Sequence, residues 1–237
     1  MVAPGLTGFM DEVREAFGWS RPADHASAIR LRDEVEARHI DGWSRKARER
    51  RWESLCRQIA DRRTVAVIGA AATIEEVSTL SMPMLVADGA YAAVRRSGVP
   101  AGQVLLLVSD GDGGLGLEEA IEDRVPMLLH AHGDNIDEWR GLLPRLEVVG
   151  LDLMLSHQLE QSVPGMVDMG GFTDGDRALA VARGCGIGPE AILSIGFRTD
   201  VVGRWSGITD PERKLVKLKW MAESMTRMGF RSQEHIE

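Results

Sequence analysis

The feature that most constrains the fold is a series of short apolar runs that begins after Arg63. Most of these runs are continuous rather than alternating in hydrophobicity, which is typical of strands buried on both faces of a parallel sheet. The sequence therefore predicts strands at 64–68, 84–87, 104–108, 127–129, 147–149, 166–169 and 191–195.

Segments with helical periodicity lie between several of these predicted strands. They span 73–79, 90–97, 117–123, 136–143 and 174–183, and a last helix is expected at about 212–228, after Pro211. Proline suits the first turn of a helix. Because strand and helix alternate, the pattern predicts an α/β fold with a mostly parallel, doubly wound, Rossmann-like sheet.

The first 61 residues have a different texture from the rest of the chain. They predict helices at about 10–17, 23–40 and 44–60, the last with Trp52, Leu55, Cys56 and Ile59 on one face. The opposite face is basic, through Arg45, Lys46, Arg48, Arg50 and Arg51; we interpret it as a solvated face, with a basic edge near a phosphate site as the alternative. We expect a helical N-terminal segment (1–61) and a catalytic domain (62–237).

Charge and cysteine content restrict the class of protein. The formal net charge of the 237 residues is -8, which argues against a nucleic-acid binder but not against a nucleotide, because a divalent ion can bridge carboxylates and phosphates. Cys56 and Cys185 fit no zinc spacing and are too few for a disulfide framework, so we expect reduced thiols and a cytoplasmic protein. Residues 1–10 do not resemble a signal peptide, and no apolar run is long enough for a membrane span.

Carboxylates follow nearly every predicted strand. In an open parallel sheet ligands bind at the carboxyl ends of the strands, which lie about 5 Å apart, so these side chains should converge. Clustered carboxylates repel one another unless a cation lies between them, and oxygen ligands without cysteine suit magnesium, manganese or calcium. The acidic strand ends lie at 87–90, 109–114, 130–135, 171–177 and 196–200.

Each motif taken alone also has a simpler explanation. Asp-Gly is a common turn. His130 and His132 could form a zinc pair, although binding of phosphate or substrate is the preferred interpretation. The 69–73 loop lacks both the Lys-Ser/Thr pair and the three-glycine fingerprint of phosphate loops, so a tight strand-to-helix turn is an equal alternative. Lys214 and Lys217 could be ordinary surface lysines or could reach phosphates together.

At these strand ends the chain resembles the archaeal 6-hydroxymethyl-7,8-dihydropterin pyrophosphokinase family, and more distantly the thiamine pyrophosphokinases. The matching segments lie between about 64 and 218, and the most specific are His-Ala-His-Gly-Asp-Asn (130–135) and Gly-Phe-Thr-Asp-Gly-Asp-Arg (171–177). Two positions depart from the family pattern. Gly-Ala-Ala-Ala-Thr (69–73) replaces a Gly-x-Gly-Pro-Ser turn, and Gly111 stands where leucine is common.

The resemblance implies Mg²⁺-dependent transfer of a diphosphate from ATP to the hydroxymethyl group of a reduced pterin, with release of AMP, in folate- or tetrahydromethanopterin-type biosynthesis. It implies magnesium ligands at Asp110 and Asp112, with Asp88 and Asp176 as further candidates. It implies that phosphates or substrate are oriented by His130, His132, Asp134 and Asn135, and that charge is offset by Arg177, Lys214 and Lys217. It also implies nucleotide or substrate contacts at Gly69, Asp88, Gly89, Thr173 and Asp174, the last accepting pterin ring N–H groups.

Three alternatives remain at this stage. Thiamine or another alcohol could be the acceptor, a metal-dependent phosphohydrolase could use the same carboxylates to activate water, and a regulator could bind nucleotide without turnover. Trp139, Trp205 or Phe172 could stack on a flat ring, although such aromatics are more often core residues. The N-terminal helices could cap the sheet, form a homodimer contact or close over the nucleotide.

Overall fold

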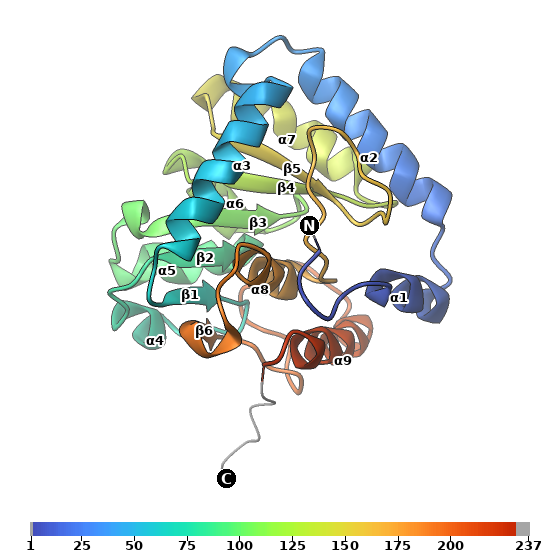
Figure 1. Ribbon diagram of the computed structural model, residues 1–237. Coiled ribbons are helices and arrows are strands. Elements are labelled where there is room, and N and C mark those ends of the chain that lie inside the picture. The colour runs from blue at the N-terminus through green and yellow to red at the C-terminus, as the bar shows by residue number, and fades with distance from the viewer. Residues whose placement is uncertain (1, 231–237) are drawn as a thin grey trace.

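A six-stranded, entirely parallel sheet forms the centre of the computed structural model, which describes residues 2–230 (Figure 1). The strand order is β5-β4-β3-β2-β1-β6. The α/β class and the parallel sheet are confirmed, whereas the narrower Rossmann-like label stays a prediction. The strands are β1 (Val65–Ile68), β2 (Met84–Ala87), β3 (Val104–Ser109), β4 (Met127–Ala131), β5 (Leu153–His157) and β6 (Ile192–Ile195).

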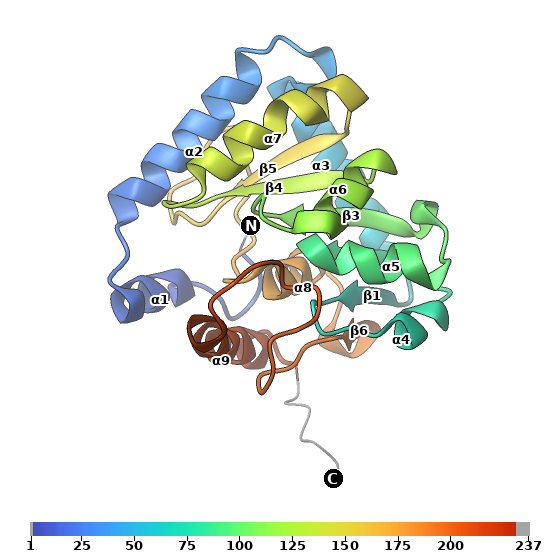
Figure 2. The same ribbon diagram turned by 180° about the vertical axis from the view of Figure 1, so that it is seen from behind.

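The order of the strands determines which face each connecting helix covers. From β1 to β5 the chain moves across the sheet in one direction, through α4 (Ile74–Ser78), α5 (Tyr91–Ser97), α6 (Gly114–Glu122) and α7 (Ile136–Val149). Right-handed crossovers in one direction place their helices on one face. The connection from β5 to β6 runs back across the sheet, and its helix α8 (Asp174–Gly184) covers the opposite face (Figure 2).

Each face of the sheet has its own hydrophobic core. Ala66 and Ile68 of β1 belong to the core beneath α4–α7, whereas Val65 and Val67 belong to the core beneath α8. Successive side chains of a strand point to opposite faces, so a continuous apolar run fills both cores. This is the physical reason why the strands lack alternation.

Two of the predicted strands were wrong. Residues 147–149 form the last turn of α7, which ends at Gly150 in the left-handed conformation (φ 63°). The fifth strand is instead Leu153–His157, a segment that was not among the predicted strands. Residues 166–169 form no strand, and Val167 makes only an isolated parallel bridge to Ser156. Runs of three or four apolar residues are too short to separate a strand from a helix end.

The three predicted N-terminal helices are confirmed as α1 (Phe9–Phe17), α2 (Arg21–Glu36) and α3 (Arg45–Ala60). Helix α2 packs on the α7 side of the sheet, whereas α1 and α3 pack on the side of α8 and of α9 (Pro211–Arg227). Figure 1 shows α1 beside α9, far along the chain. The N-terminal segment thus contributes to both cores.

The cysteines and the basic face of α3 have defined partners. Cys56 of α3 and Cys185, just after α8, form a disulfide, so the expectation of reduced thiols was wrong; two cysteines 129 residues apart can meet only through the tertiary fold.

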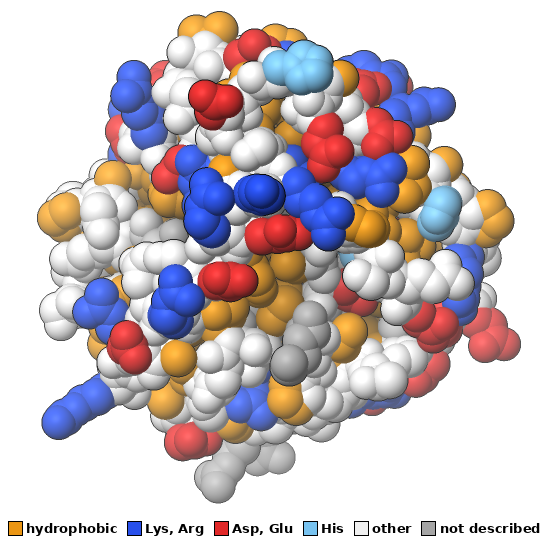
Figure 3. Space-filling view, turned by 45° about the horizontal axis from the view of Figure 1, so that its top comes forward, with side chains coloured by type: hydrophobic (Ala, Val, Ile, Leu, Met, Phe, Trp, Pro, Cys, Tyr) orange, Lys and Arg blue, Asp and Glu red, His pale blue; other side chains and the backbone are white. Residues whose placement is uncertain are grey.

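Arg48 pairs with Glu36 and Arg51 with Asp152. Basic and acidic side chains are interspersed on the face shown in Figure 3. Within residues 2–230, no helix has the length and apolarity that crossing a membrane requires.

Candidate active site

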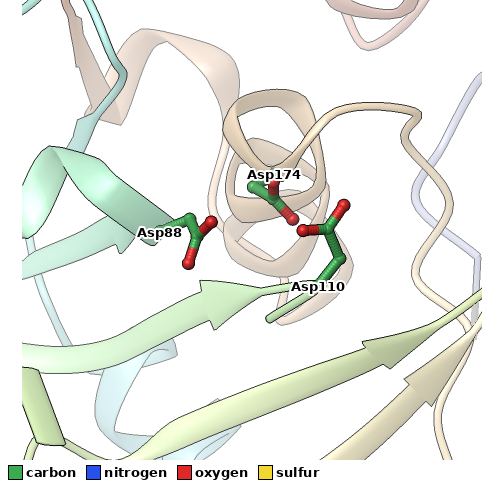
Figure 4. Close-up of side chains that lie close together, drawn as sticks. All are labelled: Asp88, Asp110 and Asp174. Atoms are coloured by element: carbon green, nitrogen blue, oxygen red, sulfur yellow. The ribbon is translucent and has the colours of Figure 1, made fainter. Parts of the chain in front are cut away.

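Three carboxylates from distant parts of the sequence meet at the carboxyl edge of the sheet. Asp88 follows β2, Asp110 follows β3, and Asp174 is the first residue of α8. One carboxylate oxygen from each lies within 4.8 Å of the others, and Figure 4 shows the three side chains converging. The convergence predicted for the ends of the strands is therefore present.

Close backbone packing holds Asp88 in this cluster. Its backbone has a positive φ (36°), a conformation that residues other than glycine rarely adopt. A Cβ atom at Gly113 would lie 2.3 Å from Asp88 Oδ1, and one at Gly89 would lie 2.3 Å from the carbonyl oxygen of Trp205. Glycine at both positions gives the strand ends room to approach one another.

Two carboxylate oxygens of the cluster lack a hydrogen-bond partner among the described residues. Oδ1 of Asp88 and Oδ1 of Asp110 are both buried and accept no hydrogen bond from the described residues. Burial and the charge of Asp174 raise the pKa of Asp88 well above its ordinary value. Burial and Asp110 likewise raise the pKa of Asp174 to about 7. Unpaired buried oxygens are costly without a partner, and the all-oxygen donor set fits a hard divalent cation.

Asp112, expected beside Asp110 as a magnesium ligand, follows in the same loop. Desolvation of its carboxylate and the charge of Asp110 raise the pKa of Asp112 to about 6. Gly111, between the two, has φ +100°, a conformation that favours glycine. The departure from the leucine pattern therefore coincides with a turn that leucine would strain.

His132 neutralises the other side of the cluster. Its Nε2 lies 3.2 Å from Asp110 Oδ2, and its Nδ1 lies 2.6 Å from Asp134 Oδ1. Burial favours the neutral ring, but the hydrogen bonds to these two carboxylates raise the pKa of His132 to about 9. In return, His132 lowers the pKa of Asp134 to about 2 and, against the effect of burial, holds that of Asp110 well below its usual value.

His130 has a different environment from His132, two residues away. Its Nδ1 lies 3.0 Å from Ser156 Oγ, and its Nε2 lies 3.3 Å from Gln158 Oε1. Burial and the nearby Arg177 lower the pKa of His130 well below its ordinary value, so the ring is neutral. Both ring nitrogens of each histidine therefore face a protein partner.

Asn135 connects the two histidines to the cluster. Its Oδ1 accepts from the backbone N–H of His132 at 2.9 Å. Its Nδ2 donates to the carbonyl oxygens of Asp110 and His130, both at 2.8 Å. The side chain is buried, and these bonds fix the loops that carry His132 and Asp110 rather than leaving its amide free.

Asp176 does not join the carboxylate cluster, contrary to expectation. It is fully buried, and its carboxylate accepts from the backbone N–H groups of Phe172 (2.8 Å) and Thr173 (2.7 Å). The Thr173 hydroxyl also donates to it at 2.6 Å. Thr173 and Asp176 thus form a capping box at the start of α8, and Asp174 occupies the cluster instead. The Thr-x-x-acid spacing was the signal that could have separated the two aspartates.

A cavity lies beside the carboxylate cluster, and the three cationic side chains expected at the site, Arg177, Lys214 and Lys217, line it. Arg177 donates through Nη1 to Asp174 Oδ1 (3.3 Å) and through Nη2 to Gln158 Oε1 (3.2 Å), while its buried Nε has no partner among the described residues. Lys214 and Lys217 of α9 both face this cavity. Burial and the neighbouring Lys214 lower the pKa of Lys217. The structure therefore favours the cavity interpretation of these lysines over an ordinary surface position.

The cavity has two lobes on either side of the aspartates. The first lobe lies against the 69–71 turn, Gly196, Phe197 and Trp205. The Ala72 N–H donates to the carbonyl oxygen of Gly69 at 3.1 Å, which closes a tight turn, and a Cβ at Gly69 would lie 2.8 Å from the carbonyl oxygen of Gly196. The second lobe is lined by Trp19, His132, Gln158, Phe172, Arg177 and Lys217. Asp112, Thr173, Asp174, Ser206 and Lys214 line both lobes.

Aromatic side chains are present in each lobe. Trp205 lines the first and Phe172 the second, as the ring-stacking expectation requires, but Trp139 is a core residue whose Nε1 donates to Ser27 Oγ at 3.2 Å. Lys217 Nζ lies 5.6 Å from the ring of Trp19 and 5.8 Å from that of Phe172. Trp19 and Gln158 were not predicted as site residues, because nothing in their local sequence distinguishes them.

Comparison with known proteins supports the family resemblance. No family model matches the chain. It is 28% identical over 184 residues to the 6-hydroxymethyl-7,8-dihydropterin pyrophosphokinase of Methanocaldococcus jannaschii, covering 73% of this chain and 71% of the relative. It is 37% identical to the enzyme of that name from Pyrococcus furiosus, over 59% of this chain and 58% of the relative. It is 29% identical to the enzyme of that name from Methanothermobacter thermautotrophicus, over 95% of this chain and 99% of the relative. The chain is therefore a relative of the archaeal 6-hydroxymethyl-7,8-dihydropterin pyrophosphokinases, as its motifs predicted.

Proposed function

We propose that this protein is a magnesium-dependent pyrophosphokinase that transfers the terminal diphosphate of ATP to the hydroxymethyl group of 6-hydroxymethyl-7,8-dihydropterin and releases AMP. The observation that carries the proposal is the cluster of Asp88, Asp110 and Asp174, with its buried and unpartnered carboxylate oxygens. The name shared by the three relatives supports the choice of acceptor.

The reaction asks for positioning and charge neutralisation more than for covalent work by the protein. The acceptor hydroxyl oxygen forms a bond to the β-phosphorus of ATP and loses its proton to solvent. The bond from the β-phosphorus to the oxygen that bridges the α- and β-phosphates breaks, and AMP departs with that oxygen. A divalent ion bound at the cluster would supply neutralisation of phosphate charge.

The residues of the cavity have complementary roles in this proposal. Asp88, Asp110 and Asp174 hold the metal ion, with Asp112 beside them, so Asp174 takes the ligand role expected of Asp176. His132, protonated at neutral pH, and the cations Arg177, Lys214 and Lys217 offset negative charge on the phosphates. The N-terminal segment belongs to the site in this proposal because Trp19 lines the second lobe.

The test is a product analysis with matched acceptors. Purified protein is incubated with ATP and Mg²⁺, first without acceptor, then with 6-hydroxymethyl-7,8-dihydropterin and then with thiamine. We expect stoichiometric AMP and pterin diphosphate with the pterin alone. AMP formation with thiamine only would move the acceptor to the thiamine class. ADP or AMP without any acceptor would identify a hydrolase and contradict the proposal.

A further inference from the structure

Asp24 of α2 is a buried carboxylate that contacts two different parts of the site. It is 3% exposed and lies outside the acidic cluster. Its Oδ1 accepts from the backbone N–H of Gly133 at 2.8 Å, in the loop that carries His132 and Asp134. Its Oδ2 accepts from Gln158 Nε2 at 2.9 Å and from Arg14 Nε at 2.8 Å. One side chain of the N-terminal segment thus holds segments that follow β4 and β5.

The side-chain amide of Gln158 connects Asp24 to Arg177. Its Nε2 donates to Asp24, and its Oε1 accepts from Arg177 Nη2 (3.2 Å) and lies 3.3 Å from His130 Nε2. A carboxylate only accepts at neutral pH and a guanidinium only donates, so reversal of the Gln158 amide would oppose donors to donors and acceptors to acceptors. The amide therefore has a single orientation.

The connection ends at the acidic cluster. Arg177, held on one side by Gln158, donates on the other side to Asp174 Oδ1 at 3.3 Å. Asp24, Gln158 and Arg177 are all at least nine-tenths buried, so water competes little for these bonds. A continuous chain of hydrogen bonds therefore runs from α2 through the second lobe to a carboxylate of the cluster.

We propose that Asp24 is a positioning residue for phosphate binding and transfer, and that it acts through two arms. The loop arm, Asp24 to Gly133, places the loop that carries His132. The relay arm, Asp24 to Gln158 to Arg177, orients a guanidinium toward the phosphates in the second lobe. This inference rests on the proposed function and gives helix α2 a part in the site.

The arms can be cut separately. An asparagine at position 24 has only one acceptor oxygen. This oxygen keeps two hydrogen bonds if it faces Arg14 and Gln158, and the NH₂ group then faces the Gly133 N–H, donor against donor. Asp24→Asn therefore removes the loop arm. Gln158→Leu removes the relay arm and leaves Asp24 with Arg14 and Gly133. In the double variant Asp24→Asn/Gln158→Glu, amide and carboxylate exchange places. The amide at position 24 can then accept from the Gly133 N–H and donate to the carboxylate at position 158, which accepts from Arg177, while Arg14 Nε loses its acceptor at position 24.

The control is Ser27→Ala on the same helix. Ser27 is fully buried, and its hydroxyl accepts from Trp139 Nε1 at 3.2 Å, so the variant loses a buried hydrogen bond to α7 without touching either arm. It reports the effect of weakening α2 alone. Thermal unfolding of every variant shows whether the destabilisation is comparable.

Two measurements test the proposal. The first is the kcat and the KM for ATP in pterin-dependent AMP release. The second is the affinity for inorganic diphosphate with Mg²⁺, measured by calorimetry, which requires no turnover. We expect Asp24→Asn and Gln158→Leu to lower kcat about 10–100-fold and to weaken diphosphate binding about 10-fold, with KM changed less. Ser27→Ala should match the wild type in kcat and in diphosphate affinity. The double variant Asp24→Asn/Gln158→Glu, which we call the exchange variant, should have a higher kcat and a higher diphosphate affinity than Asp24→Asn.

The two possible failures are distinguishable. A wild-type chain that releases no AMP refutes the proposed function, while diphosphate affinity still decides whether Asp24 positions the phosphate site. Equal diphosphate affinity in Asp24→Asn, Gln158→Leu and Ser27→Ala overturns the inference whatever the turnover. Should Asp24→Asn fail to fold, Gln158→Leu tests the relay arm from its other end.

Discussion

Buried negative charge is treated differently on two sides of the acidic cluster. We call them the His132 side, with His132, Asp110 and Asp134, and the Asp88 side, with Asp88 itself. On the first side, His132 lies between Asp110 and Asp134, and the pKa values of both carboxylates are lowered. On the second side, Asp88 has a buried oxygen without a partner among the described residues, and burial together with nearby acidic groups raises its pKa. The two sides lie at the ends of the neighbouring strands β2, β3 and β4.

The contrast between the two sides shows which part of the site the protein neutralises with its own side chains. The His132 side is neutralised by the protein's own cation and is stable as it stands. In the proposed function, the carboxylate charge of the Asp88 side is compensated when a divalent ion binds. A metal-dependent enzyme gains from this division, because one side is rigid in advance and the other is ready for the ion.

Removal of one carboxylate from each side should cause the greatest loss of activity. Asp88→Asn and Asp110→Asn should each lower Mg²⁺-dependent AMP release by about 10³-fold, roughly 4 kcal/mol of transition-state stabilisation, because both carboxylates hold the ion in our proposal. Initial rates at saturating ATP and Mg²⁺ measure the effect. Near-normal turnover in both variants would remove the metal role of the cluster.

Protons compete with a metal ion for the carboxylates whose pKa is raised. The pKa of Asp112 is raised to about 6, that of Asp174 to about 7 and that of Asp88 well above its usual value, so protons occupy these groups at low pH and must leave before a metal ion binds. Mg²⁺ affinity should therefore rise on the order of 100-fold between about pH 5.5 and pH 8, with proton release. Calorimetry in buffers of different ionisation enthalpy measures both quantities. A pH-independent affinity would contradict this account.

The stability of the ion-free protein should respond with opposite signs on the two sides. A carboxyl whose folded pKa is raised destabilises the fold above its unfolded pKa, so Asp88→Asn should stabilise the chain by about 1–2 kcal/mol at pH 8. A carboxyl whose folded pKa is lowered contributes stability above its unfolded pKa, so Asp110→Asn should destabilise by about 2–3 kcal/mol. Urea unfolding in EDTA measures both, and effects of equal sign would end the distinction between the sides.

The smallest expected effect tests how Asp88 is held. Gly113→Ala would place a Cβ 2.3 Å from Asp88 Oδ1 and force this side chain to move, so the Mg²⁺ concentration for half-maximal rate should rise about 5- to 10-fold, the equivalent of about 1 kcal/mol. Gly114→Ala is the control, because Gly114 has φ +54° but no atom within 4 Å of the place that a Cβ would occupy. It should lower stability and leave the Mg²⁺ requirement unchanged. The same Mg²⁺ requirement in both variants would contradict the role of Gly113.

Much of the fold followed from local pattern. Continuous apolar runs predicted five of the six strands, and helical periodicity predicted every long helix within residues 2–230, because burial on both faces or on one face imposes those patterns directly. The failures lie where pattern is ambiguous. Residues 147–149 are as apolar as a short strand but end α7, and 153–157 was overlooked beside them. The pairing of Cys56 with Cys185 had no local signal.

Residue type and order along the chain were sufficient to predict the class of the fold, the edge of the sheet where acidic groups gather and the family that the chain resembles. The tertiary structure alone decided that Asp174 rather than Asp176 joins Asp88 and Asp110, and that Asp24 and Gln158 reach the site. Two aspartates two residues apart at a helix start point in different directions, and hydrogen bonds across more than 100 residues exist only after packing. Spacing along the chain records neither direction nor packing, which is the physical reason for the division.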